Sequence, residues 1–168
     1  MLVGYFFIAR CRFNPMNLEM VLTTVQQEAA DSLLRHLAVC PVAVLSGAAG
    51  AGKTAVLKTV QATRGGVFLG ARQFMNARQA EGPAAIEEAF FRMIEDAIES
   101  HGLVLVDDLC LVANAARGGG DGRVHLLDAA LTAILAEARA LGRKLVFAVE
   151  DDIPWPIRRR AQIVHLVD

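Results

Sequence analysis

The chain has 168 residues, enough for one domain with a stable core, and 54% of its residues are hydrophobic, which excludes a disordered chain. The formal net charge of −1 excludes a general electrostatic attraction to nucleic acid or to an anionic membrane. Cys11, Cys40 and Cys110 have no metal-ligand spacing among themselves or with the histidines, so we expect buried thiols in a reducing compartment.

The N-terminal residues are apolar, but the run from Leu2 to Ala9 is much too short to span a bilayer. It also lacks a basic leader and a small-residue cleavage site. We expect residues 1–16 to be an N-terminal extension. This extension is either a strand packed on the core or an artefact of an upstream start, with Met16 or Met20 as the true one. A soluble cytoplasmic protein without membrane contact is expected.

The next residues predict a helix and then a strand. Asn17 can cap this helix, and apolar residues recur after it at near-helical spacing. These residues are Leu18, Val21, Val25, Ala29, Leu33 and Leu37. Pro41 follows, and residues 42–46 (VAVLS) predict a short strand that is apolar throughout.

Residues 53–63 predict a second helix, which ends before Gly65 and Gly66. Residues 67–70 predict a second strand. Pro83 suits the first turn of a further helix with one charged and one apolar face. The apolar face consists of Ile86, Phe90, Met93, Ala97 and Ile98.

Residues 103–108 (LVLVDD) predict a third strand, and residues 116–122 predict a flexible loop. A long helix follows, with Val124, Leu127, Leu131, Ile134, Ala138 and Leu141 on one stripe. Residues 144–149 and 163–167 predict the fourth and fifth strands. The strands alternate with helices and have no polar alternation, so both faces of the sheet must be covered. The prediction is an α/β fold, a three-layer α/β/α sandwich around a five-stranded parallel sheet.

The stretch GAAGAGKT lies between the first strand and the second helix and matches the pattern of phosphate-binding loops. Its glycines and small residues expose backbone N–H groups to a polyphosphate, and the helix start adds its positive dipole end. We expect Lys53 to reach the β- and γ-phosphates and the Thr54 hydroxyl to bind Mg²⁺. The predicted nucleotide-binding residues are Gly47, Ala48, Ala49, Gly50, Ala51, Gly52, Lys53, Thr54 and Ala55.

Asp107 and Asp108 end the third strand, where parallel α/β sheets bind their ligands. We expect Asp107 to hold Mg²⁺ through water and Asp108 to act as general base on the attacking water. The alternative is that the two carboxylates merely cap the strand.

On these residues the chain resembles the AAA+ family of P-loop ATPases over residues 17–168, with GAAGAGKT as Walker A and LVLVDD as Walker B. The resemblance implies sheet order 5-1-4-3-2, ring assembly, and ATP bound between subunits. It also implies that an arginine of one subunit reaches the γ-phosphate of the next. In the similar segment PWPIRRRAQIVHL, the candidate is Arg158, Arg159 or Arg160; the alternative is a solvated basic turn.

The chain departs from the family in three places. Asp108 stands where Glu is usual, although replication initiators and helicase loaders also have Asp-Asp. Acidic residues Glu150 to Asp152 follow the fourth strand, where a polar sensor is usual, and they would repel a γ-phosphate unless Mg²⁺ or an arginine intervenes. The helical lid is expected to be absent, which would weaken nucleotide affinity and ring assembly. For a substrate-gripping loop, residues 72–82 offer Phe74 and Met75, which fit core positions equally well.

These features predict Mg-dependent ATP binding and hydrolysis, coupled to remodelling or loading of a protein or nucleic-acid substrate. Assembly would be a homo-oligomeric ring or a complex with a partner chain. Two alternatives stay open: a truncated or degenerate nucleotide-binding module with little or no turnover, and a small P-loop kinase. ATP is preferred to GTP because the guanine-reading motif Asn-Lys-x-Asp does not occur in the sequence.

Overall fold

The computed structural model describes residues 21–81, 86–107, 109, 121–150 and 152–167. The predicted extension 1–16, Asn17, Pro83, Asp108 and Asp151 therefore lie outside the described residues. The described elements are, in chain order, α1 (Thr24–Val39), β1 (Val42–Gly47), α2 (Lys53–Arg64), β2 (Val67–Leu69), α3 (Ala71–Glu81), α4 (Ile86–Ser100), β3 (Leu103–Val106), α6 (Asp121–Ala140), β4 (Lys144–Val149), α7 (Trp155–Arg158) and β5 (Gln162–Leu166).

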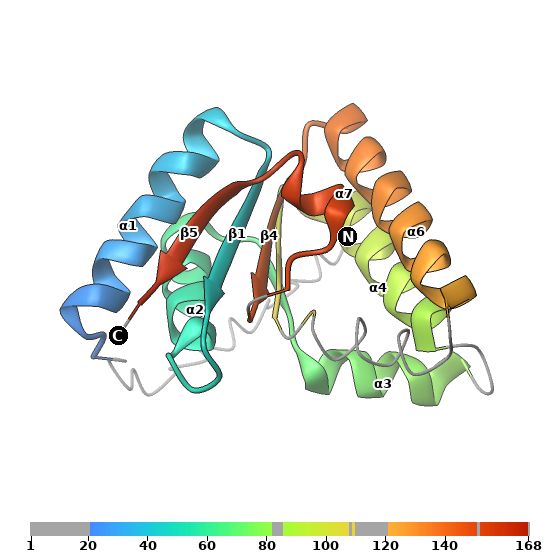
Figure 1. The fold of residues 1–168 in the computed structure, drawn as a ribbon, viewed down its shortest axis with the longest axis horizontal. Coiled ribbons are helices and arrows are strands. Elements are labelled where there is room, and N and C mark those ends of the chain that lie inside the picture. The colour runs from blue at the N-terminus through green and yellow to red at the C-terminus, as the bar shows by residue number, and fades with distance from the viewer. Residues whose placement is uncertain (1–20, 82–85, 108, 110–120, 151, 168) are drawn as a thin grey trace, which may run out of the picture.

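The five strands form one sheet in the order β2-β3-β4-β1-β5, and every neighbouring pair is parallel. This order is the predicted 5-1-4-3-2 counted from the opposite edge of the sheet, so the predicted topology is confirmed. All strands point downward in Figure 1, and their carboxyl ends lie together at the lower end of the molecule.

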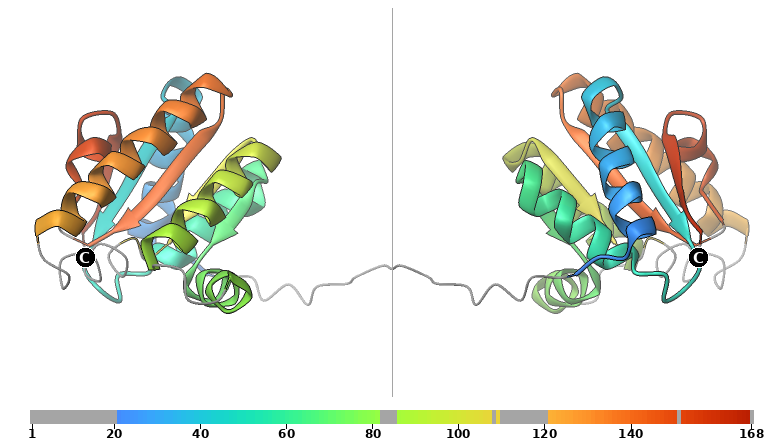
Figure 2. Two further views of the ribbon diagram at one scale, coloured as in Figure 1. Left: turned by 90° about the vertical axis from the view of Figure 1, so that its right-hand side faces the viewer. Right: turned by 90° about the vertical axis from the view of Figure 1, so that its left-hand side faces the viewer.

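Helices cover both faces of the sheet. Successive residues of a strand point to opposite faces, so each strand contributes side chains to two cores. Val42 and Val44 of β1 belong to the core on the side of α4 and α6. Ala43 and Leu45 belong to the core on the side of α1 and α2. Figure 2 shows this arrangement of helices, sheet and helices from the two sides. The predicted three-layer sandwich is confirmed.

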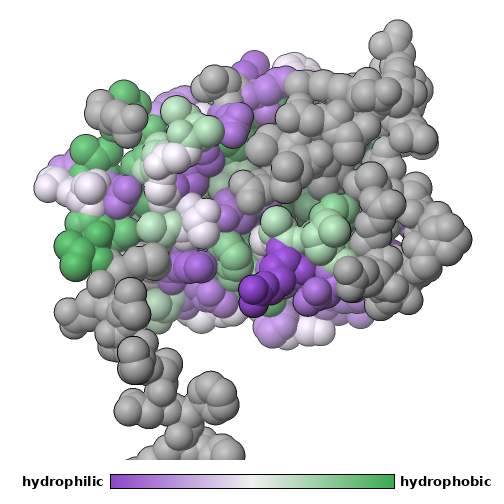
Figure 3. All heavy atoms as spheres, turned by 90° about the horizontal axis from the view of Figure 1, so that it is seen from below, coloured by the Kyte–Doolittle hydropathy of each residue, from purple (hydrophilic) through white to green (hydrophobic). Residues whose placement is uncertain are grey.

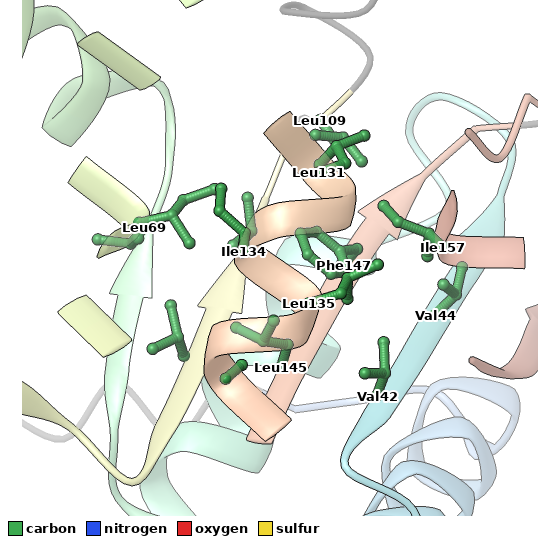
Figure 4. Packing of buried hydrophobic residues seen from close by; sticks show 14 of the residues in the cluster. Val42, Val44, Leu69, Leu109, Leu131, Ile134, Leu135, Leu145, Phe147 and Ile157 are labelled. Atoms are coloured by element: carbon green, nitrogen blue, oxygen red, sulfur yellow. The ribbon is translucent and has the colours of Figure 1, made fainter. Parts of the chain in front are cut away.

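The core on the α6 side fixes β4 in the middle of the sheet. Phe147 of β4 is fully buried together with Leu131 and Ile134 of α6 (Figure 4). Burial of such side chains stabilises the fold by about 1.5–3 kcal/mol each. Ile157 of α7 joins the same cluster and is also fully buried. One buried layer therefore joins β4, α6 and α7.

Helix α1 begins at Thr24, later than the predicted start after Asn17. The reason is a capping box: Gln26 N donates to Thr23 Oγ1 at 3.3 Å, and Thr23 N donates to Gln26 Oε1 at 3.1 Å. Val21 precedes the helix and is 90% exposed, so its prediction as a residue of the apolar stripe was wrong. The apolar face of α1 consists of Ala29, Ala30, Leu33 and Leu37.

The segment after the second strand is helix α3, although the prediction was a loop with Phe74 and Met75 as pore or core residues. The Phe74 ring packs edge-on against Phe90 of α4, with ring centroids 6.0 Å apart. Met75 is 52% exposed and is not a core residue. Gly70 N donates to Gln73 Oε1 at 3.1 Å, which satisfies a backbone donor where the helix begins.

Helix α6 begins at Asp121, so the end of the predicted loop 116–122 is helical, and residues 116–120 lie outside the described residues. Leu127, Leu131, Ile134 and Ala138 of the predicted stripe are buried, as is Leu135. Leu141 follows the helix and is 46% exposed, so the stripe ends before it.

Candidate functional site

The glycine-rich loop connects β1 to α2 at the carboxyl end of the sheet, the lower end in Figure 1. Lys53 is the first residue of α2, and its ammonium folds back over the loop. Lys53 Nζ donates to the carbonyl oxygens of Gly47 at 2.7 Å and Ala48 at 2.8 Å. The Lys53 ammonium is therefore held close to the loop backbone, where a polyanion would bind.

The loop glycines are required for different reasons. A Cβ on Gly47 would lie 2.8 Å from the carbonyl oxygen of Leu166 in β5, so strand packing excludes a side chain there. Gly50 has open space around it but a φ of +83°, and Gly52 has a φ of +92°. Both values lie in the region that only glycine adopts without strain. We predicted all three for access to phosphate, but the structure gives Gly47 a packing role.

The start of α2 presents uncapped backbone donors. Gly52 is the N-cap, and no side chain caps the helix. The Gly52 carbonyl accepts from Ala55 N at 2.9 Å and Val56 N at 3.1 Å. The N–H groups of Lys53 and Thr54 precede this pair in the first turn, where intrahelical acceptors do not exist. Such a helix start binds anions through its N–H groups and its dipole.

Asp107 follows β3 directly and is only 6% exposed. Its backbone N–H donates to Leu69 O at 2.8 Å, which continues the pairing with β2 beyond the end of β3. The Thr54 hydroxyl donates to Asp107 Oδ2 at 2.6 Å. As in the predicted strand order, β4 lies between β1 and β3, so Asp107 does not stand on the neighbour of the loop strand. Contact is made through α2, which reaches from the loop to the end of β3.

These two side chains have the chemistry of a partial magnesium site. A hydroxyl and a carboxylate oxygen in contact are ligands that Mg²⁺ accepts, usually with water and substrate phosphates completing its shell. Among the described residues, no group of three or more His, Cys, Asp and Glu could hold a metal ion. Thr54 and Asp107 could supply two oxygen ligands to a magnesium ion whose other ligands are water and phosphate.

The end of β4 is fixed to the end of β1. The Ser46 hydroxyl, which is buried, donates to the Glu150 carbonyl at 2.8 Å. The Glu150 side chain itself is exposed. Asp151, the second acidic residue predicted at the sensor position, and Asp108, the predicted base, lie outside the described residues, so their roles stay predictions.

The three candidate arginines lie at the end of α7 and directly after it, before β5 begins. Arg158 ends α7, and Gln162, soon after Arg160, pairs with Ala43 near the start of β1. Leu166 pairs with Gly47 at the end of β1, four residues or about 13 Å further along the strand. Arg159 stacks on the Trp155 ring at 5.3 Å, and Trp155 is 62% exposed. Arg160 Nη1 donates to Pro156 O at 3.4 Å.

Sequence reasoning missed Gln26. Its Nε2 donates to the carbonyl oxygen of Ala51 in the loop at 3.0 Å, while its Oε1 belongs to the cap of α1. The spacing Thr-x-x-Gln at residues 23–26 is a capping-box pattern and could have identified the start of α1. The contact with the loop has no counterpart in local sequence, because 25 residues separate Gln26 from Ala51.

The end of the molecule that carries the loop has a mixed surface. Figure 3 looks at this end from below, and hydrophilic residues gather near the middle of the described part while apolar residues gather at one side. Three exposed valines lie near the start of α1 and the end of β5: Val25 is in the first turn of α1, Val21 precedes α1, and Val167 follows β5. In the part of the chain that the structure describes, every helix is too short or too polar to cross a lipid bilayer.

Comparison with solved structures shows the fold. The Pif1 helicase of Candida albicans matches with a TM-score of 0.50 and 15% identity, over 88% of this chain and 39% of that chain. A Walker-type ATPase of Pyrococcus abyssi matches at 0.46 and 18% identity, over 78% of this chain and 46% of that one. A katanin structure matches with a TM-score of 0.46 and 18% identity, over 88% of this chain and 52% of that chain.

No family model matches the sequence, and no curated protein matches it. The chain spans between 39% and 52% of the length of these three structures. The parallel sheet, its strand order and the likeness to the helicase show that the chain has the α/β fold of P-loop nucleoside triphosphatases.

Proposed function

We propose that the protein binds MgATP at the loop 47–54 and hydrolyses its β–γ phosphoanhydride. The hydrogen bond of 2.6 Å between Thr54 and Asp107 carries this proposal. It brings together the hydroxyl and the carboxylate that a nucleotide-bound magnesium needs, beside the uncapped start of α2. The Lys53 ammonium, already held over the loop by two carbonyl oxygens, supports the same conclusion.

Each residue has a defined part in this proposal. The loop N–H groups and Lys53 bind the β- and γ-phosphates, and Lys53 exchanges a carbonyl oxygen for a phosphate oxygen when the nucleotide enters. Thr54 and Asp107 hold Mg²⁺, which neutralises phosphate charge when bound. Asp108 accepts the proton of the attacking water.

A second copy of the chain supplies the arginine. Arg158, Arg159 and Arg160 precede β5, whose first residue Gln162 pairs with Ala43 near the start of β1, whereas Lys53 follows the end of β1. Arg159 is stacked on Trp155 and Arg160 donates to Pro156. The side chain of Arg158 is exposed and makes no hydrogen bond or ion pair with any other described residue, and only its backbone N–H is engaged, with Pro154 O at 3.0 Å. We therefore assign the trans-acting role to Arg158, within the AAA+ arrangement implied by the sequence.

The second candidate function is a nucleotide-binding module with little turnover. The carboxylate of Glu150 at the end of β4 favours it, because an exposed acidic residue there replaces a neutral water-positioning group. Both candidates share the nucleotide site and differ only in phosphate release, which one assay separates.

The test is a phosphate-release assay over a series of protein concentrations, with calorimetry of MgATP binding in parallel. Wild type should bind and hydrolyse ATP, Lys53→Ala should do neither, and Asp108→Asn should bind without hydrolysis. Lys58→Ala is the matched control, because Lys58 lies on the same helix above the Phe68 ring. Since a helicase shares the fold, single-stranded DNA is the first stimulator to add. No heat with MgATP would reject both candidates.

A further inference from the structure

We propose that Gln26 is a positioning residue for the phosphate-binding loop, and this inference rests on the proposed binding of a nucleotide there. Its carboxamide joins two segments that are distant in sequence. Oε1 accepts the N–H of Thr23 at 3.1 Å, and Nε2 donates to the carbonyl oxygen of Ala51 at 3.0 Å. The side chain is half-buried between the start of α1 and the loop.

Both contacts fix the orientation of the amide. The backbone N–H of Thr23 can only donate, so it requires the oxygen of the carboxamide, and the Ala51 carbonyl can only accept, so it requires the nitrogen. Rotation of the carboxamide by half a turn would place its NH2 group against the Thr23 N–H and its oxygen against the Ala51 carbonyl oxygen. Neither hydrogen bond could then form. Gln26 is therefore held in one orientation by backbone groups alone.

The contact with Ala51 also sets the direction of the next loop N–H. In a trans peptide unit the carbonyl and the N–H point in opposite directions, and the described chain contains no cis peptide bond. When Gln26 binds the Ala51 carbonyl, the Gly52 N–H is directed away from α1. A loop peptide held in this way offers its donor to a phosphate without first having to reorient.

Gly52 and Gln26 depend on each other. A Cβ on Gly52 would lie 2.3 Å from Gln26 Nε2, too close for both to stay in place. The missing side chain at position 52 therefore makes room for the Gln26 amide, in addition to permitting a φ of +92°. A substitution at either residue should disturb the same peptide unit.

Three variants separate the loop contact from the helix cap. Gln26→Leu keeps the size of the side chain and removes both contacts, whereas Thr23→Ala removes half of the cap and keeps the bond to Ala51. Gln27→Ala is the matched control, because Gln27 Nε2 donates to Asp31 Oδ1 at 3.1 Å within α1 and not to the loop. Thr23→Ala and Gln26→Leu should both lower Tm by about 2–4 °C.

Two measurements on the full chain then decide the proposal. Calorimetry with MgATPγS should show a Kd raised about three- to tenfold in Gln26→Leu and changed less than about twofold in Thr23→Ala and Gln27→Ala. Hydrogen exchange without nucleotide should be faster at residues 51–54 in Gln26→Leu alone. An equal Kd for MgATPγS and equal hydrogen exchange at residues 51–54 in Gln26→Leu and Thr23→Ala would overturn the positioning role of Gln26.

The two readouts keep this inference distinct from the proposed function. If wild type binds no MgATPγS, the proposed function fails, and faster exchange in Gln26→Leu still shows that Gln26 holds the loop. If exchange rises in Gln26→Leu while Kd stays at the wild-type value, the proposed function stands and the positioning role is wrong.

Discussion

The hydroxyl of Thr54 and the carboxylate of Asp107 are in hydrogen-bond contact at 2.6 Å, although 53 residues separate them in the sequence. Thr54 is exposed in the first turn of α2, and Asp107 is buried at the end of β3. A hydrogen bond to a buried charged group is stronger than one between neutral groups. The contact therefore fixes the start of α2 on the end of a strand that is not a neighbour of β1.

Replacement of Thr54 should separate the role of its hydroxyl from that of its shape. Thr54→Ala should lower the free energy of unfolding by about 1–3 kcal/mol, because it removes a partner of the buried Asp107 carboxylate. It should also abolish the Mg²⁺ dependence of ATP binding, while Thr54→Ser retains it. Thermal unfolding and calorimetry with and without Mg²⁺ measure the two effects. Equal behaviour of the Ala and Ser variants would contradict the assigned ligand role.

Lys53→Ala should lower ATP turnover by about 100-fold or more, because it removes the charge that meets the transferring phosphoryl group. Its Tm should change little, since Lys53 is only half-buried and its ammonium contacts two carbonyl oxygens of its own loop. Lys58→Ala removes an equal charge from the same helix and should keep wild-type turnover. A similar loss in both variants would point to general electrostatics in place of a specific contact.

Gly47→Ala and Gly50→Ala should differ in stability. The Cβ at position 47 meets the Leu166 backbone at 2.8 Å, and overpacking of this kind costs about 1–3 kcal/mol. Position 50 has open space, so the substitution there costs only the left-handed backbone strain of about 1–2 kcal/mol. Urea unfolding should show the larger loss for Gly47→Ala, together with weakened pairing of β5. The reverse order would contradict the packing role of Gly47.

Arg158→Ala should lower turnover by about 10³-fold at high protein concentration, if its guanidinium acts on the nucleotide of a second copy. Arg160→Ala should have a smaller effect, because Arg160 is engaged with the Pro156 carbonyl. The measurement is specific activity against protein concentration for both variants and wild type. Activity in wild type that does not depend on concentration would reject the trans arrangement.

The fold could be predicted from the sequence to the level of topology. Uninterrupted apolar runs such as residues 103–106 indicated buried parallel strands, and the glycine spacing at 47–54 placed the loop after the first of them. These signals are local, so they hold regardless of the tertiary contacts. The AAA+ subtype and the expected absence of its helical lid rest on resemblance and stay predictions.

One local signal was overlooked, and features that depend on distant contacts were missed. The start of α1 at Thr24 is selected by a capping box, which outweighs the apolar spacing that suggested an earlier start. Helix α3 was expected to be a loop because the family resemblance implied a substrate-gripping loop there; within residues 71–76, Phe74 packs against the core. The contacts of Gln26 with Ala51 and of Ser46 with Glu150 join segments that only the folded sheet brings together.

The chain has one tryptophan, and it lies on the α7 turn beside the three arginines. Its fluorescence therefore reports on a single place, the turn that connects the end of β4 to the start of β5. Quenching upon addition of MgATP would record a change in the surroundings of this exposed ring, such as the arrival of another molecule at the turn or a rearrangement transmitted along the sheet.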